Sequence, residues 1–304
     1  MDALLKIQNI AVIDLGTNTF NLLIIKKTTS GYNEVYSEKV GVGLGLGGIT
    51  KNIIVNNAIL RGIDTLKHYK SICDKYHVSE IFAFGTSAIR NATNKEDFLA
   101  QVANHTGIII HVISGEIEAN YIFAGVLSGL PKLNNYLIMD IGGGSTEFIH
   151  ANYSKIKAAQ SFEIGVARIF QNMQFADPFT EKDCQKIEDY LEKKVGSFFD
   201  AVTVSVLVGA SGSFETLYEL IHNTEYPNGK YSTFSKTEIQ KELDSIIQST
   251  FAEREKNKHI IPIRKKMIPI AAVKIRWIIR KLNIQKIIIS PYSLKEGIIA
   301  EVIN

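Results

Sequence analysis

The sequence predicts an α/β protein made of two tandem copies of one domain, with a cleft between them. An apolar strand, an Asp-containing glycine turn and a return strand occur twice, in IAVIDLGTNTFNLLII (10–25) and YLIMDIGGGSTEFIH (136–150), with the aspartates 126 residues apart. A second motif pair, GTSAIR (85–90) and GASGSF (209–214), recurs at an offset of 124 residues. Two motif types that recur at nearly one offset indicate an internal duplication.

Each copy has three strand-like runs, then a helical stretch, a short apolar strand and a Gly-Ser/Thr turn. In the first copy, taken as residues 1–125, these are strands 9–15, 18–28 and 33–40, helix 55–76 and strand 80–84, closed by helix 115–128. In the second copy, residues 126–304, they are strands 136–141, 146–152 and 156–163, helix 181–199 and strand 204–208, closed by helices 236–256 and 266–282, strand 286–290 and helix 293–303. The last helix could pack back on the first domain, and the polar segment 222–235 predicts a surface loop. This order predicts mixed sheets with helices around them.

The composition is that of an ordinary globular protein. Of 304 residues, 45% are hydrophobic and 21% are charged, and the net charge is +3. Cys73 and Cys184 cannot form a disulfide framework and lie in no CxxC pair. The N-terminus lacks a basic region before a long apolar run, and no stretch reaches about 18 apolar residues. We therefore expect a cytoplasmic protein without a signal peptide or a membrane span.

Glycine turns at the ends of apolar strands are the first candidate site. Such turns present backbone N–H groups and hydroxyls to phosphate oxygens, although either turn alone could be an ordinary hairpin. Two matched copies favour phosphate binding, and GTSAIR and GASGSF add a guanidinium and further hydroxyls. The candidates are Thr17, Asn18, Thr19, Arg90, Gly143, Gly144, Ser145, Thr146, Ser211 and Gly212.

Three carboxylates accompany these turns, namely Asp14, Asp140 and Glu147. Hard oxygen ligands of this kind suit Mg²⁺, with Mn²⁺ as the second candidate. The alternative is that the aspartates only accept hydrogen bonds from turn N–H groups.

Glu118 is the candidate general base. In ISGEIEANYIFAG (113–125) it shares a helix face with Tyr121, Ile122 and Gly125, so we expect partial burial. Burial raises the pKa of a carboxylate, which suits a group that takes a proton from water. The alternative is that acids in the first helical turn only complement the helix dipole.

Other features favour ordinary structure. The run VGVGLGLGG (40–48) predicts a flexible connection rather than a dinucleotide site, and the chain has no P-loop, HExxH or GxSxG motif. Trp277 lies among apolar helix residues and is expected in the core.

The motifs DLGTNTF, GTSAIR, ISGEIEA, DIGGGSTEF, GASGSF and SPYSLKEGI resemble, in order and spacing, the exopolyphosphatase / guanosine pentaphosphate phosphohydrolase family. The resemblance implies two ribonuclease-H-like domains of the actin-like ATPase type. It also implies hydrolysis of a terminal phosphoanhydride, with Glu118 activating water, Asp140 and Glu147 acting with magnesium, and Arg90 gripping phosphate.

The resemblance extends to two further arginines and shows some departures. Arg264, in IPIRKKMIP, matches a phosphate-binding arginine of the family, and Arg168 matches a pattern whose role is open. GTNT replaces the usual GSNS, and Asn21 stands where the family often has a basic residue.

The substrate expectation is inorganic polyphosphate, with guanosine pentaphosphate as the alternative. A kinase or ATPase and a non-catalytic phosphate sensor are further alternatives. No membrane or nucleic-acid partner is expected, and a homodimer is left open. Between Arg254 and Lys286 the chain carries eleven Lys or Arg and one acid. Beside a phosphate site, this basic stretch predicts a track for a polyanion, with a solvated helix face as the alternative.

Overall fold

A computed structural model describes residues 8–29, 31–227 and 229–303. Residues 1–7, where the signal-peptide expectation falls in part, lie outside the described residues. The chain divides into two compact units, one from Met1–Ser114 with Ile298–Asn304 and one from Gly115–Gly297. The boundary lies before helix α4 (Gly115–Gly129), which the sequence analysis placed in the first domain. The physical reason is that α4 packs on strands β7 and β8 of the second unit.

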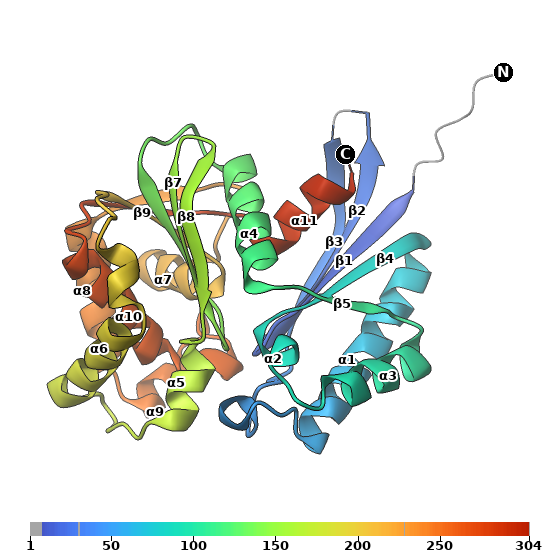
Figure 1. Cartoon of the computed structure of the whole chain (residues 1–304), viewed down its shortest axis with the longest axis horizontal. Helices are drawn as coiled ribbons and strands as arrows, with labels where there is room; N and C mark the ends of the chain where they lie inside the picture. Colours follow the sequence, from blue (N-terminus) through green and yellow to red (C-terminus); the bar gives the residue numbers. More distant parts are fainter. Residues whose placement is uncertain (1–7, 30, 228, 304) are drawn as a thin grey trace. The chain divides into compact units, whose positions relative to one another are not determined.

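The first unit is built on a five-stranded sheet in the order β3-β2-β1-β4-β5. Its strands are β1 (Asn9–Leu15), β2 (Thr19–Thr28), β3 (Gly31–Gly41), β4 (Val78–Gly85) and β5 (Ile110–Val112). The first three pair antiparallel, and β4 and β5 continue the sheet in parallel. Helices α1 (Asn56–Lys75) and α3 (Lys95–Thr106) pack together in this unit (Figure 1).

The second unit repeats this plan. Its six-stranded sheet has the order β10-β11-β9-β6-β7-β8. The strands are β6 (Tyr136–Ile141), β7 (Thr146–Asn152), β8 (Lys155–Phe162), β9 (Val206–Ala210), β10 (Ser232–Ser235) and β11 (Lys286–Ile289). Strands β8-β7-β6-β9-β11 have the pairing of β3-β2-β1-β4-β5, with the same parallel and antiparallel senses. The duplicated topology confirms the predicted fold class.

Apolar helices form the core of the second unit beside its sheet. Helix α10 (Ile268–Lys281) packs against α5 (Val166–Asn172), α6 (Glu181–Val195) and α8 (Lys236–Gln248). Trp277 is 6% exposed and lies edge-on to Phe199, as expected of a core residue. Every residue of α10 from Ile268 to Ile279 is buried. A helix that is buried on all sides must satisfy any polar group it carries, and Lys274 is such a case.

Two local expectations were wrong. The predicted loop 222–235 contains strand β10, which pairs antiparallel with β11 at the sheet edge. The predicted helix 236–256 is two helices, α8 and α9 (Phe251–Lys256), because Thr250 begins the second one. Thr250 and Glu253 form a capping box, in which each side chain bonds the other residue's backbone N–H.

Three more helices position residues discussed below: α2 (Ser87–Arg90), α7 (Gly212–His222) and α11 (Leu294–Val302). Short 3-10 turns occupy Ile49–Lys51, Gly196–Phe199 and Pro262–Arg264. None of the helices in the described ranges has both the length and the apolar character required to span a bilayer.

Candidate active site

Two carboxylates face each other on neighbouring strands of the second unit. Asp140 on β6 pairs directly with Glu147 on β7, so both side chains lie on one face of the sheet. Asp140 is 6% exposed and Glu147 is 1% exposed. Two acids in this arrangement repel each other, and the loss of water strengthens the repulsion.

Hydroxyl groups hold both carboxylates in place. Ser161 donates to Oε1 of Glu147 at 2.6 Å, and the Ser145 side chain also bonds this carboxylate. Ser293, which precedes α11, donates to Oδ2 of Asp140. The acids are therefore oriented by hydroxyls of the adjacent turn, of β8 and of the segment before α11.

Glu118 joins these acids from helix α4. It is 6% exposed, so the expected burial of this helix face is confirmed. Burial raises the pKa of Glu147 well above its ordinary value, and the charges of Glu118 and Asp140 raise it further. The second unit thus concentrates three buried carboxylates in one electrostatic environment.

The turn between β6 and β7 has the hydrogen-bond pattern of an anion-binding loop. The N–H groups of residues 165–168 donate to the carbonyls of Gly142, Gly143 and Gly144 at 2.8–3.2 Å. In the described part of the chain, the N–H groups of Gly143 and Gly144 donate to no backbone carbonyl. The carbonyls are occupied and these donors remain available, which is the arrangement that a phosphate oxygen requires.

Gly165 allows this packing between the loop and the start of α5. A Cβ at this position would overlap the backbone of Gly143 and Gly144. Arg168 contributes from the same helix, because its Nε donates to the carbonyl of Gly144 at 3.3 Å and its Nη2 pairs with Glu163 at 3.3 Å. In this structure Arg168 supports the loop.

A second set of phosphate candidates gathers at the start of α7. Ser211 precedes the helix with φ 67° and ψ −178°, a conformation that is strained for a residue with a side chain. Its hydroxyl is buried and has no hydrogen-bond partner in the described ranges. The Arg264 guanidinium lies against Gly212, where a Cβ would overlap it, and donates to Thr216 at 3.2 Å. Strain and an unpartnered hydroxyl at one turn point to a ligand there.

Thr146 has a contact that the sequence did not predict. It is completely buried, and its hydroxyl donates to the Ser145 carbonyl while it accepts a hydrogen bond from Lys274 Nζ. Its hydroxyl is therefore used inside the fold, and its contact with phosphate stays a prediction. The sequence does not reveal this role of Lys274, because the residue falls within the basic stretch 254–286.

The first unit carries the equivalent turn, with an asparagine in place of the second acid. Gly16 N–H bonds the Thr19 carbonyl at 3.0 Å, as Gly142 N–H bonds that of Ser145 at 3.1 Å. Asp14 pairs across β1 and β2 with Asn21, whose amide donates to Oδ2 at 2.8 Å. Asn21 thus has the position in the first unit that Glu147 has in the second, and it donates a hydrogen bond to the aspartate.

The remaining first-unit candidates form hydrogen bonds with other residues of that unit. The carbonyls of Thr17 and Asn18 accept from the N–H groups of Gly45 and Gly43, so the glycine run is packed against this turn and largely buried. Arg90, in α2, donates to the carbonyl of Ile113 at 3.2 Å. These residues stay predicted ligand contacts.

Asp140 and Glu147 fit a divalent cation. A cation between two buried, facing carboxylates would relieve their repulsion. Within the described ranges, no three His, Cys, Asp or Glu side chains are grouped so as to hold a metal ion. Magnesium is commonly held by one or two carboxylates together with water and substrate phosphate, so two are sufficient. Asp14, in the first unit, stays a predicted ligand.

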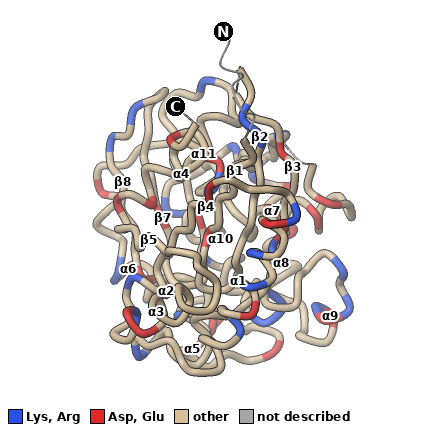
Figure 2. Tube along the Cα trace, turned by 90° about the vertical axis from the view of Figure 1, so that its right-hand side faces the viewer, with Lys and Arg blue, Asp and Glu red and all other residues tan. Residues whose placement is uncertain are grey.

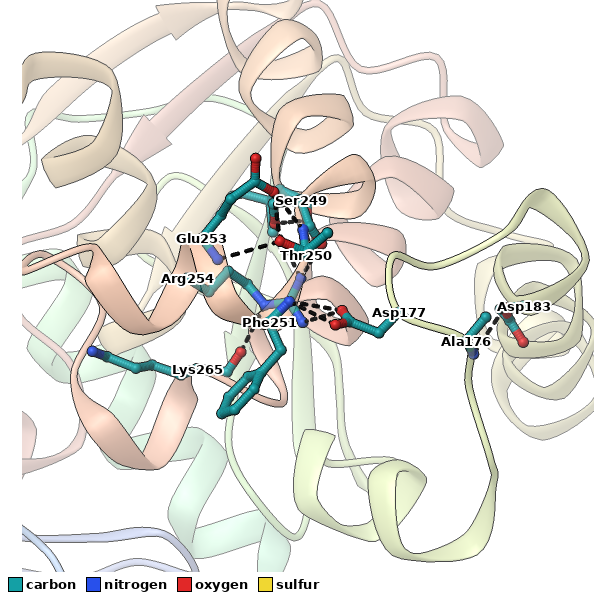
Figure 3. A network of polar contacts seen from close by, with 10 residues as sticks. Ala176, Asp177, Asp183, Ser249, Thr250, Phe251, Glu253, Arg254 and Lys265 are labelled. Atoms are coloured by element: carbon teal, nitrogen blue, oxygen red, sulfur yellow. Dashed lines mark hydrogen bonds and ion pairs between the residues drawn. The ribbon is translucent and has the colours of Figure 1, made fainter.

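Part of the basic stretch 254–286 is used within the fold, so the expected track stays a prediction for its exposed residues. Figure 3 shows Arg254 reaching Asp177, the backbone at Ser249 and the carbonyl of Lys265, and its side chain is 5% exposed. Arg276 lies among Glu181, Glu188 and Asp244. Near α9 the trace carries both signs of charge (Figure 2).

The geometry agrees with comparisons to known proteins. The model of the Ppx/GppA phosphatase family matches residues 23–304. The chain belongs to the Ppx/GppA phosphatase family. A crystal structure of an exopolyphosphatase from Cytophaga hutchinsonii is 35% identical, with a TM-score of 0.93 over 97% of this chain and 98% of that one.

Longer Ppx/GppA relatives are similar over part of their length. The bifunctional 3-dehydroquinate synthase/phosphatase of Fusobacterium nucleatum is 32% identical over 96% of this chain and 46% of its own. The guanosine-5′-triphosphate,3′-diphosphate pyrophosphatase of Aeromonas salmonicida is 27% identical over 95% of this chain and 58% of its own. The chain thus spans about half the length of these curated relatives.

Proposed function

We propose that this protein is an exopolyphosphatase, which hydrolyses the terminal phosphoanhydride of inorganic polyphosphate with magnesium. The observation that carries the proposal is the burial of Glu118, Asp140 and Glu147 together in the second unit. They accompany a loop with two available backbone N–H donors. The likeness to the Cytophaga hutchinsonii exopolyphosphatase over nearly the whole of both chains supports the same substrate class.

The proposed roles follow from position and chemistry. Glu118 acts as the general base that takes a proton from the attacking water. The N–H groups of Gly143 and Gly144 donate hydrogen bonds to the phosphoryl oxygens, and Arg264 adds a cation near Gly212. Magnesium, bound by Asp140 and Glu147, would neutralise charge on the phosphate oxygens. Ser161 and Ser293 keep the two carboxylates oriented.

Guanosine pentaphosphate is the alternative substrate. The pyrophosphatase of Aeromonas salmonicida supports it, because it matches 95% of this chain. The same acids and loop would act on a 5′-terminal phosphate, so the two activities differ only in what holds the rest of the substrate.

Phosphate release from four substrates tests the proposal. Purified protein is given tripolyphosphate, long-chain polyphosphate, guanosine pentaphosphate or ATP, each with and without Mg²⁺. The proposal predicts the highest kcat/KM on polyphosphate and its loss on metal removal. A preference for guanosine pentaphosphate would contradict the proposal and favour the alternative substrate. Tight binding without turnover would indicate a non-catalytic phosphate sensor.

A further inference from the structure

A lysine is buried in contact with Thr146, the residue that follows the proposed phosphate-binding turn. Lys274 lies in the middle of α10, is completely buried, and has buried apolar residues as its chain neighbours. An unpaired ammonium in such a place would cost several kcal/mol, so its contacts must compensate. The burial of this lysine requires a structural or functional reason.

The contacts of Lys274 connect two segments of the site. Its Nζ donates to Oγ1 of Thr146 and to the carbonyl of Ile164 at 2.6 Å. Thr146 directly follows the Gly142–Ser145 turn. Ile164 directly precedes the residues whose N–H groups donate hydrogen bonds to the carbonyls of this turn. One side chain therefore ties the turn to the segment that supports it.

We propose that Lys274 is a positioning residue that holds the turn at residues 142–146 in its phosphate-binding conformation. It does so from inside the fold, by fixing Thr146 relative to Ile164, and it does not touch the substrate. This inference rests on the proposed function, because it assigns a role within the same site. It replaces the interpretation of Lys274 as part of a surface track.

Electrostatics agrees with this placement. Burial lowers the pKa of Lys274 to about 7, and the nearby charge of Glu147 opposes that shift. A neutral amine retains two N–H donors and an ammonium has three, so both contacts persist in either protonation state. The positioning role therefore does not depend on the charge of Lys274.

Binding measurements on matched variants test this proposal. Lys274→Met removes the donor. Thr146→Val removes one acceptor, together with the bond from the Thr146 hydroxyl to the Ser145 carbonyl, and leaves the lysine in place. Lys281→Met is the control on the same helix, because its Nζ pairs with Glu192 at 2.6 Å, away from the turn. Tripolyphosphate affinity is measured by calorimetry in a Glu118→Gln background, which limits turnover, and unfolding by urea is measured in parallel.

The expected result is about tenfold weaker tripolyphosphate binding for Lys274→Met and for Thr146→Val, the size of one hydrogen bond involving a charged group. Because both variants break the contact between Lys274 and Thr146, the double variant should bind little worse than either alone. Lys281→Met should bind within about twofold of the parent.

Two results would overturn the proposal. One is unchanged affinity for folded Lys274→Met together with altered stability, which would make the lysine purely structural. The other is full additivity of the two changes, which would mean that they act through separate contacts. Because binding is measured without turnover, failure of the wild-type protein to hydrolyse polyphosphate would contradict the proposed function and leave this test intact.

Discussion

At the scale of single residues, the environment of a side chain decides its role more than its type does. Glu116 and Glu118 both lie in the first turn of α4, but Glu116 is exposed and Glu118 is buried near Asp140 and Glu147. Their spacing along the helix distinguishes them, because only Glu118 falls on the apolar face. The contacts of Lys274 are not predictable in this way, because a lysine within an apolar helix has the same sequence pattern whether it reaches solvent or a buried hydroxyl.

The pH dependence of stability should reveal the buried lysine. In the folded state the pKa of Lys274 is about 7, whereas an unfolded lysine titrates near ~10.4. Between these values the unfolded state binds more protons, so the contribution of Lys274 to stability rises with pH through this window. Below pH 7 both states are protonated and the contribution is constant.

Urea unfolding of wild type and Lys274→Met at several pH values measures this effect. The wild-type free energy of unfolding, relative to the variant, should increase by on the order of 1 kcal/mol per unit above pH 7. Other titrating groups cancel in the difference between the two proteins. A difference that stays flat from pH 7 to 9 would show that Lys274 is not desolvated.

At the scale of elements, the duplicated hairpins were predictable and the short elements were not. The strands around DLG and DIG are apolar runs separated by glycine turns, which makes them recognisable in the sequence. Their register pairs Asp14 with Asn21 and Asp140 with Glu147. Strand β10 is four residues within a polar segment, and only its pairing with β11 makes it a strand. The break between α8 and α9 was detectable in principle, because Thr250 and Glu253 have capping-box spacing.

The close packing of α5 on the glycine loop at residues 142–145 gives a prediction for an element. In Gly165→Ala the new Cβ meets the backbone of Gly143 and Gly144, which cannot move aside as a side chain could. We expect a loss of about 1–3 kcal/mol in stability and a larger fractional loss of kcat/KM, because the loop shifts.

Gly196→Ala is the matched control for this substitution. Its Cβ would meet the side chain of Glu192, which is flexible. Denaturant unfolding and phosphate-release kinetics compare the two variants. Equal kinetics for Gly165→Ala and wild type would contradict the close packing of α5 on the loop.

At the scale of the whole molecule, charge along the sequence is a poor guide to charge on the surface. The stretch 254–286 contains most of the local positive excess, but Arg254, Lys274 and Arg276 are buried with partners. Sequence alone could not separate these from exposed residues such as Lys256 and Lys258. Whether a charged residue is buried with a partner or exposed therefore depends on the tertiary packing.

Salt dependence of the Michaelis constant tests whether this stretch guides long substrates. Because Arg254, Arg276, Arg280 and Lys281 are paired with acids, we expect KM to depend on salt concentration in the same way for tripolyphosphate and for long-chain polyphosphate. A clearly steeper dependence for the long chain would support the polyanion track.

The most direct test of the central claim compares Glu118→Gln with Glu116→Gln on long-chain polyphosphate with Mg²⁺. Both substitutions remove one carboxylate from the same helical turn, but only Glu118 belongs to the buried acidic group. The account predicts that Glu118→Gln loses turnover by at least about a hundredfold while still binding substrate, and that Glu116→Gln retains it. Near wild-type phosphate release by Glu118→Gln would contradict the account.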